Sequence, residues 1–151
     1  MEGVRYCHMG RSPEQGFDCL GQVYYFFKRI GLPVFVPPEG TRYPRDYWKA
    51  GVSFTYLNKL SEQFSVIPER CAQFGDVYVF VAKPGTGMVA HTGIVMDPAV
   101  GRFQHVVQAR PTGYNTIRER FWAARLHGVM RYRRMDLLHR RVASVPKELK
   151  V

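Results

Sequence analysis

The sequence has few cysteines and no long apolar run, and both absences restrict the class of protein that it can encode. Three of the 151 residues are cysteine, an odd number that cannot be fully paired. This argues against a framework of disulfides and predicts at least one free thiol, in a reducing compartment. No apolar run approaches the ~18 residues of a membrane-spanning helix, so no transmembrane segment is expected. The length fits one domain with a buried core.

A secretory signal is missing as well. Such a signal begins with a basic region followed by an apolar core, and residues 1–7 do not fit that pattern. We therefore expect synthesis in the cytoplasm without a recognisable signal peptide.

Acidic residues are scarce relative to basic ones. The chain has 12 Asp and Glu against 22 Lys and Arg, which gives a net charge of +10. This excess favours an anionic partner, whether nucleic acid, a membrane surface or an acidic polymer such as cell wall. Residues 136–151 are expected to form a basic tail, which is either a solvated segment or a docking segment for an anionic surface. Aromatic residues are sparse there, so we expect no specific nucleic-acid partner.

The sequence does not indicate a phosphate or metal site. Residues 85–87 (Gly-Thr-Gly) lack the lysine and the helix that follow a phosphate-binding loop. Cys7, His8 and Cys19 match no common zinc spacing. We therefore expect no metal and no cofactor.

One short stretch, Gly-Phe-Asp-Cys-Leu-Gly at residues 16–21, carries the strongest chemical signal. Asp18 is a good N-cap residue, so Cys19 is expected to open a helix. A thiol at that position lies at the positive end of the helix dipole, which favours the thiolate and a nucleophilic role. The alternative is a small buried apolar residue, as most free cysteines are.

The rest of the chain is expected to place strands after this helix. Apolar residues at spacings of three and four predict that the helix covers 19–30. Residues 76–82 are apolar on both faces of a strand, which predicts a central strand. We assign Cys71 to packing and His127 to the capping of a helix end. The other expected elements are strands at 91–96, 102–109 and 129–135, and a helix at 118–126 closed by Gly128.

Cysteine catalysis needs a base, and often a third group that orients the base. The turn residues between the two strands predict a hairpin in which Met96 faces Arg102 and Gly93 faces His105. His91 and His105 would then project from one face as diagonal neighbours, about 7–8 Å apart at the backbone. Gly93 would leave room for an imidazole. A shift of one residue would put the two rings on opposite faces.

Five blocks follow one another along most of the chain: Gly3-x-x-Tyr6, Gly16-Phe17-Asp18-Cys19-x-Gly21, Gly75-Asp76, His91-x-Gly93-Ile94 and Phe103-x-His105. In this order they resemble the NlpC-type cell-wall cysteine peptidases. Those are compact papain-like domains that cleave peptides of peptidoglycan, commonly between D-glutamate and diaminopimelate. The resemblance implies a papain-like α+β domain at 1–135, in which an N-terminal helix with the cysteine packs on a central antiparallel sheet.

The resemblance also implies roles for individual residues. Cys19 would be the nucleophile, His91 the general base and His105 the residue that orients His91. Tyr6 matches a tyrosine near the nucleophile that helps to hold the oxyanion or the substrate. Asp18 matches the aspartate before the nucleophile, for which either helix capping or contact with a substrate amine is expected.

Two positions depart from the family's usual pattern. Leu20 stands where a serine is usual, a variant associated with phage tail proteins, and residues 8–10 (His-Met-Gly) replace Trp-Gly-Gly. We therefore expect action on the cell wall or in the periplasm, with delivery as part of a virion as one route and phage tail proteins as partners. Two other functions stay open: a related thiol hydrolase or acyltransferase with another amide or ester substrate, and a non-catalytic structural or anionic-surface binding module on the same fold.

Overall fold

The computed structural model describes residues 2–32, 60–107 and 110–135, so the expected tail at 136–151 lies outside the described residues. A six-stranded antiparallel sheet has the order β3-β8-β4-β5-β6-β7, and β1 and β2 form a small separate hairpin. The elements are β1 (Arg11–Ser12), β2 (Gly16–Phe17), α1 (Cys19–Arg29), β3 (Phe64–Ile67), the 3₁₀ turn η1 (Glu69–Cys71), β4 (Val77–Val81), β5 (Val89–Asp97), β6 (Arg102–Val107), β7 (Arg110–Thr116), α3 (Arg120–Ala123) and β8 (Leu126–Tyr132).

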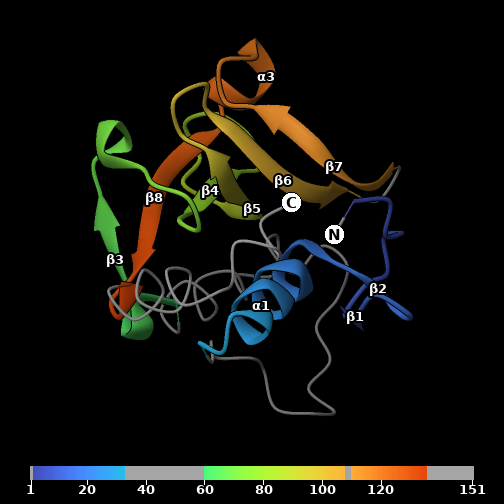
Figure 1. Cartoon of the computed structure of the whole chain (residues 1–151). Coiled ribbons are helices and arrows are strands. Elements are labelled where there is room, and N and C mark those ends of the chain that lie inside the picture. Colours follow the sequence, from blue (N-terminus) through green and yellow to red (C-terminus); the bar gives the residue numbers. More distant parts are fainter. Residues whose placement is uncertain (1, 33–59, 108–109, 136–151) are drawn as a thin grey trace.

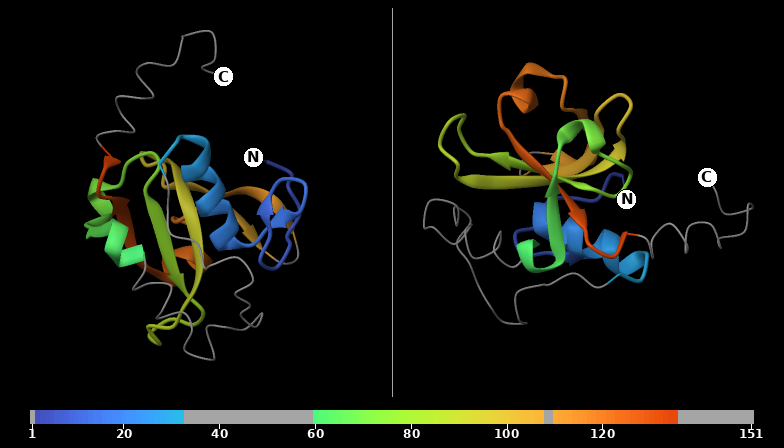
Figure 2. Two further views of the ribbon diagram at one scale, coloured as in Figure 1. Left: turned by 90° about the horizontal axis from the view of Figure 1, so that it is seen from below. Right: turned by 90° about the vertical axis from the view of Figure 1, so that its left-hand side faces the viewer.

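The sheet separates helix α1 from helix α3. Helix α1 covers one face and the short helix α3 lies over the other (Figure 1), and the right-hand view of Figure 2 shows the same order of layers. This arrangement confirms the expected α+β class with the cysteine helix packed on an antiparallel sheet. No helix among the described residues is long and apolar enough to cross a membrane.

Strand β4 occupies the centre of the sheet. It pairs with β5 on one side and β8 on the other, and all five of its residues are buried. The prediction of a central strand from its two apolar faces is thus confirmed. Its even and odd residues contribute to two separate apolar clusters, one on each face.

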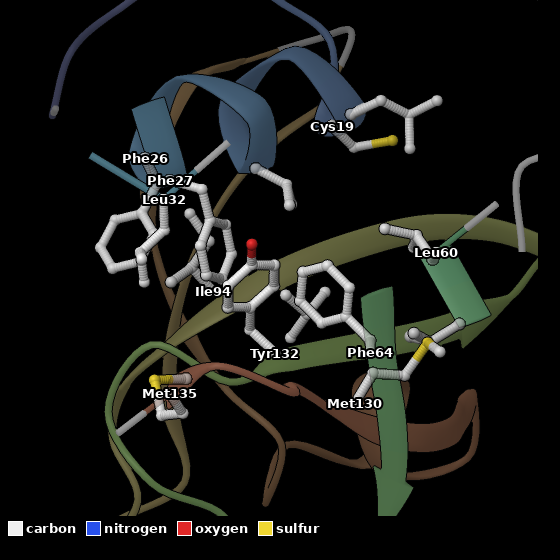
Figure 3. Packing of buried hydrophobic residues seen from close by; sticks show 14 of the residues in the cluster. Cys19, Phe26, Phe27, Leu32, Leu60, Phe64, Ile94, Met130, Tyr132 and Met135 are labelled. Carbon is white, nitrogen blue, oxygen red and sulfur yellow. The ribbon is translucent and has the colours of Figure 1, made fainter. Parts of the chain in front are cut away.

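The cluster beneath α1 is rich in aromatic residues. Phe27 projects from the helix onto Phe64 of β3 and Tyr132 of β8, with ring centroids 5.3 and 5.5 Å apart (Figure 3). Cys19 lies at the other end of the helix, at the border of the same cluster. Burial of these large rings fixes the helix on the sheet, and with it the position of Cys19.

The segment after α3 differs from the sequence prediction. Helix α3 covers only Arg120–Ala123, the next two residues form a turn, and β8 begins at Leu126. Gly128 and His127, expected to end and to cap a helix, therefore lie within a strand. The reason is tertiary: β8 pairs on both sides, with β3 and β4, and this pairing outweighs the local helical preference.

The basic residues at 131–134 are partly structural. Arg131 donates to both carboxylate oxygens of buried Asp76, at 3.0 and 2.8 Å, and ties the start of β4 to β8. The hydrogen bond to Asp76 raises the pKa of Arg131. Arg133 donates to the carbonyl oxygens of Glu62 and Ser61. These two arginines hold the sheet together rather than present a free basic surface.

Candidate active site

The start of α1 is held by one carboxylate. Asp18 is the N-cap residue, and its Oδ1 accepts from the backbone N–H of Gly21 at 2.7 Å. The same carboxylate accepts from the N–H of Met9 at 2.8 Å and from Nη1 of Arg11 at 2.7 Å. The predicted N-cap is therefore confirmed. Asp18 fixes both the helix that begins with Cys19 and the loop in front of it, and a contact with a substrate amine stays a prediction.

Three glycines let this loop approach the helix closely. A Cβ added at Gly21 would overlap the carbonyl oxygen of Gly10, and one added at Gly10 would overlap the carbonyl oxygen of Gly16. Gly16 also has a φ of 99°, which favours glycine. The glycine two residues after Cys19 is thus explained by packing against backbone, which cannot move aside as a side chain can.

Gly21→Ala is expected to destabilise the fold by about 2–3 kcal/mol, because the new methyl group pushes the loop off the helix. For a chain of this size that lowers the midpoint of thermal unfolding by roughly 5–10 °C. Gly128→Ala is the matched control, since a Cβ there meets no atom within 4 Å. Circular dichroism melts of the two variants give the comparison, and equal midpoints would contradict the packing argument.

Strand β5 contacts the first residue of the helix. The hydroxyl of Thr92 donates to the carbonyl oxygen of Cys19 at 3.1 Å. His91, the residue before Thr92, follows an irregularity in the pairing of β5 with β4, where Phe80 faces His91 and Val81 faces Val89. Such bulges redirect side chains and are common beside active sites. Thr92 therefore faces the helix start, whereas its neighbour His91 stacks on Phe80, which belongs to the apolar cluster on the other face of the sheet.

His91 and His105 lie together, as the sequence predicts. Nε2 of His91 is 2.9 Å from Nδ1 of His105, and the ring centroids are 5.1 Å apart. The hairpin differs from the prediction beside its turn. Arg102 pairs with Asp97 instead of Met96, because the pairing is irregular after Val95.

Gly93 makes room for a different ring from the one expected. A Cβ at Gly93 would overlap Cδ2 of the Phe103 ring instead of an imidazole. The Phe103 ring in turn lies against His105, with centroids 4.9 Å apart. The glycine therefore acts on the histidine pair through Phe103.

Aromatic rings enclose the histidine pair. The ring of Phe80 stacks on His91, and Trp122 of α3 lies 5.5 Å from His91 and 4.8 Å from His105 between centroids. Burial lowers the pKa of His91 to about 3, and the neighbouring His105 adds to this effect. Burial also lowers the pKa of His105. Near neutral pH His91 is therefore an uncharged ring.

Two further residues extend the pair, and sequence reasoning missed both. Nε2 of His105 is 2.6 Å from Oδ1 of Asn115, and Nδ2 of Asn115 is 3.2 Å from each carboxylate oxygen of Glu119. Asn115 lies on β7, which the sequence does not suggest because the strand contains Pro111, Gly113 and Asn115. The Asn and Glu spacing of four residues before a helix is the only local signal for the contact.

The remaining predicted residues have clear positions. Tyr6 forms an isolated parallel bridge with Phe17, which places it beside the strand that leads into Cys19. Its role with the oxyanion or substrate stays a prediction. Cys71 is exposed at the end of η1, so the packing role expected for it is wrong. No group of three or more His, Cys, Asp or Glu within 2–32, 60–107 and 110–135 could hold a metal ion.

Comparison with known proteins places this geometry among relatives. The family model described as "NlpC/P60 family" matches residues 3–131. A curated relative, the gamma-DL-glutamyl hydrolase of Bacillus subtilis (strain 168), is 30% identical over 146 residues. That alignment covers 97% of this chain but 28% of the relative, so the chain spans little more than a quarter of the relative's length.

Two solved structures share the fold. One is a protein of the NLP/P60 family from Staphylococcus aureus, similar to a lipoprotein, which is 26% identical with a TM-score of 0.61. The alignment covers 87% of this chain and 37% of that chain. The other is an NlpC/P60 family protein from Bacillus cereus, 23% identical with a TM-score of 0.64, with 87% and 36% of the two chains covered.

Proposed function

Because the chain belongs to the NlpC/P60 family, we propose that it is a cysteine peptidase that hydrolyses amide bonds in the peptides of peptidoglycan. The observation that carries the proposal is the uncharged His91–His105 pair, which joins β5 to β6, while Thr92 of β5 donates to the carbonyl oxygen of Cys19. Nucleophilic catalysis by cysteine uses a thiol whose proton is taken by an imidazole, and these are the roles that we assign to Cys19 and His91.

The proposed reaction uses a covalent intermediate. His91 takes the proton of the Cys19 thiol, and the sulfur attacks the substrate carbonyl. The imidazolium then protonates the leaving amine, which leaves a thioester on Cys19. Water, deprotonated by the same imidazole, hydrolyses the thioester. The backbone N–H of Cys19 and the hydroxyl of Tyr6 are the donors that we assign to the oxyanion.

The proposed bond is an amide formed by the γ-carboxyl of D-glutamate, of the D-glutamyl–diaminopimelate type. The name of the Bacillus subtilis relative specifies a γ-glutamyl bond, and the net charge of +10 suits a substrate that carries free carboxylates. Leu20, in place of the usual serine, is buried in the apolar cluster beneath α1. Origin in a phage and association with tail proteins stay predictions of the sequence.

A panel of peptides tests the substrate. We expect cleavage of a stem peptide with a γ-D-glutamyl–diaminopimelate bond, and cleavage at least about 100-fold slower of the isomer linked through the α-carboxyl. Products are identified by mass after separation. Equal rates for the two isomers would contradict the proposed bond.

The same panel separates the alternatives. A γ-linked polyglutamate chain tests an anionic polymer without a wall peptide, and simple esters test a related hydrolase. A product joined to an added amine would indicate an acyltransferase. No product from any substrate, together with a Cys19 that reacts with iodoacetamide no faster than free cysteine, would favour the non-catalytic binding module.

A further inference from the structure

The Asn115 side chain lies between a histidine and a carboxylate, and its orientation is determined by the carboxylate. Its Nδ2 is 3.2 Å from both oxygens of Glu119, while its Oδ1 is 2.6 Å from Nε2 of His105. An ionised carboxylate can only accept hydrogen bonds, so it requires the NH₂ group of the amide to face it. The amide oxygen must then face His105.

This orientation fixes the position of one proton after another. Since the amide oxygen only accepts, Nε2 of neutral His105 must carry the proton and its Nδ1 must be bare. The bare Nδ1 accepts from Nε2–H of His91 at 2.9 Å. His91, neutral as well, is then left with a bare Nδ1. That nitrogen is the one able to take the proton of a thiol.

The reverse orientation would remove the base. With the amide NH₂ group facing His105, Nε2 of His105 would be bare and the proton would move to its Nδ1. His91 would then have to accept at Nε2 and carry its own proton on Nδ1. In that tautomer Nδ1 of His91 has no lone pair to accept the thiol proton. If His91 were protonated to the imidazolium, its Nε2–H would point at the Nδ1–H of His105.

We infer that Glu119 is a positioning residue for catalysis, which acts through Asn115 and His105 to hold His91 in the tautomer with a bare Nδ1. The inference rests on the proposed function, in which that nitrogen receives the thiol proton. The direction of the effect on His105 agrees, because Asn115 and Glu119 oppose the lowering of its pKa by burial.

A purely structural role for Glu119 is the competing explanation. Its Oε1 also accepts from the backbone N–H of Thr116 at 3.2 Å, and Glu119 immediately precedes α3. Loss of Glu119 could therefore loosen the turn between β7 and α3. Such loosening would lower stability without selecting between the two tautomers of His91.

The surroundings supply a matched control. A cavity of about 840 Å³ is lined by His105, Asn115 and Glu119, and also by the charged side chains of Glu2 and Arg110. Glu2→Ala removes the same charge from the same cavity without touching the Asn115 amide. A through-space effect of charge would appear in both variants, whereas an effect carried by the hydrogen bonds would appear only in Glu119→Ala.

The decisive measurement is the tautomer itself, read from the ¹⁵N chemical shifts of ¹⁵N-histidine-labelled protein near neutral pH. In the wild type and in Glu2→Ala, both His91 and His105 are expected to carry the proton on Nε2. In Glu119→Ala and Asn115→Ala, His91 is expected to show the Nδ1–H form in a substantial fraction. This readout needs no substrate, so it stands apart from the success or failure of the proposed function.

Kinetics give the second readout. Glu119→Ala is expected to lower kcat on the γ-glutamyl peptide by about 10- to 100-fold with little change in KM, as befits a damaged base. The amide oxygen of Glu119→Gln can still accept from Asn115, so this variant should retain more activity than Glu119→Ala. It also provides a comparison if the alanine variant does not fold. Unchanged tautomers in folded Glu119→Ala or in folded Asn115→Ala, or a loss of kcat matched by Glu2→Ala, would overturn the inference.

Discussion

Cys19→Ala is expected to abolish hydrolysis of the γ-glutamyl stem peptide, with a loss of at least about 10³-fold, while the protein remains folded. The substitution removes only the sulfur atom, which is the atom that attacks the carbonyl in the proposed reaction. Cys19 is only 7% exposed, so the loss of its sulfur atom costs some packing. We expect a cost of about 1 kcal/mol, too little to unfold a domain.

Two other cysteines provide controls for Cys19. Cys7 is half-buried in the loop before the helix, and Cys71 is exposed in η1. Alanine at either position should leave the rate of hydrolysis within about twofold, because neither thiol lies at a helix start. Loss of activity in Cys7→Ala or Cys71→Ala, together with full activity in Cys19→Ala, would show that Cys19 is not the nucleophile.

His91→Gln is expected to lower the rate about 10²- to 10⁴-fold, the usual contribution of a general base. His105→Ala should cost less, because it removes the partner of the base and not the base itself. Both rates are measured near neutral pH, where His91 is uncharged. An activity of His91→Gln close to that of the wild type would exclude the proposed base.

The same variant tests the burial of His91 through stability. Its pKa is lowered from the usual 6.5 to about 3 in the folded state, so between these values the unfolded state binds more protons. Stability must therefore fall as the pH drops from 6.5 towards 3, by up to about 1.4 kcal/mol per pH unit for one such group. His91→Gln should lose less stability than the wild type between pH 7 and 5, measured as the midpoint of unfolding in urea.

Local signals are what made the helix that begins with Cys19 and the histidine pair predictable. Asp18 at the N-cap and the apolar stripe of the helix act within a few residues of each other, and the helix forms as the sequence suggests. The histidine pair depends only on the register of one hairpin, and alternation along a strand leaves few choices. The structure departs from that register only beside the turn, where Asp97 takes the place of Met96.

Contacts made by the whole fold were not predictable in this way. Strand β7 contains Pro111 and Gly113, which disfavour strands, and it forms because β6 pairs along its length. Asn115 reaches His105 only once that pairing exists. Trp122, which covers both imidazoles, lies on a helix of one turn that faces the sheet. These residues complete the site through tertiary structure, for which the spacing of Asn115 and Glu119 is the only local signal.

The most direct test of the central claim follows the acyl group. The wild-type protein is mixed with the γ-D-glutamyl stem peptide and quenched in acid within the first turnovers. The protein is then digested, and the masses of its peptides are measured by mass spectrometry. A γ-glutamyl thioester on the peptide that contains Cys19, removed by hydroxylamine and absent from Cys19→Ala, is the predicted result. An acyl group on another residue, or equal product from the wild type and Cys19→Ala, would contradict it.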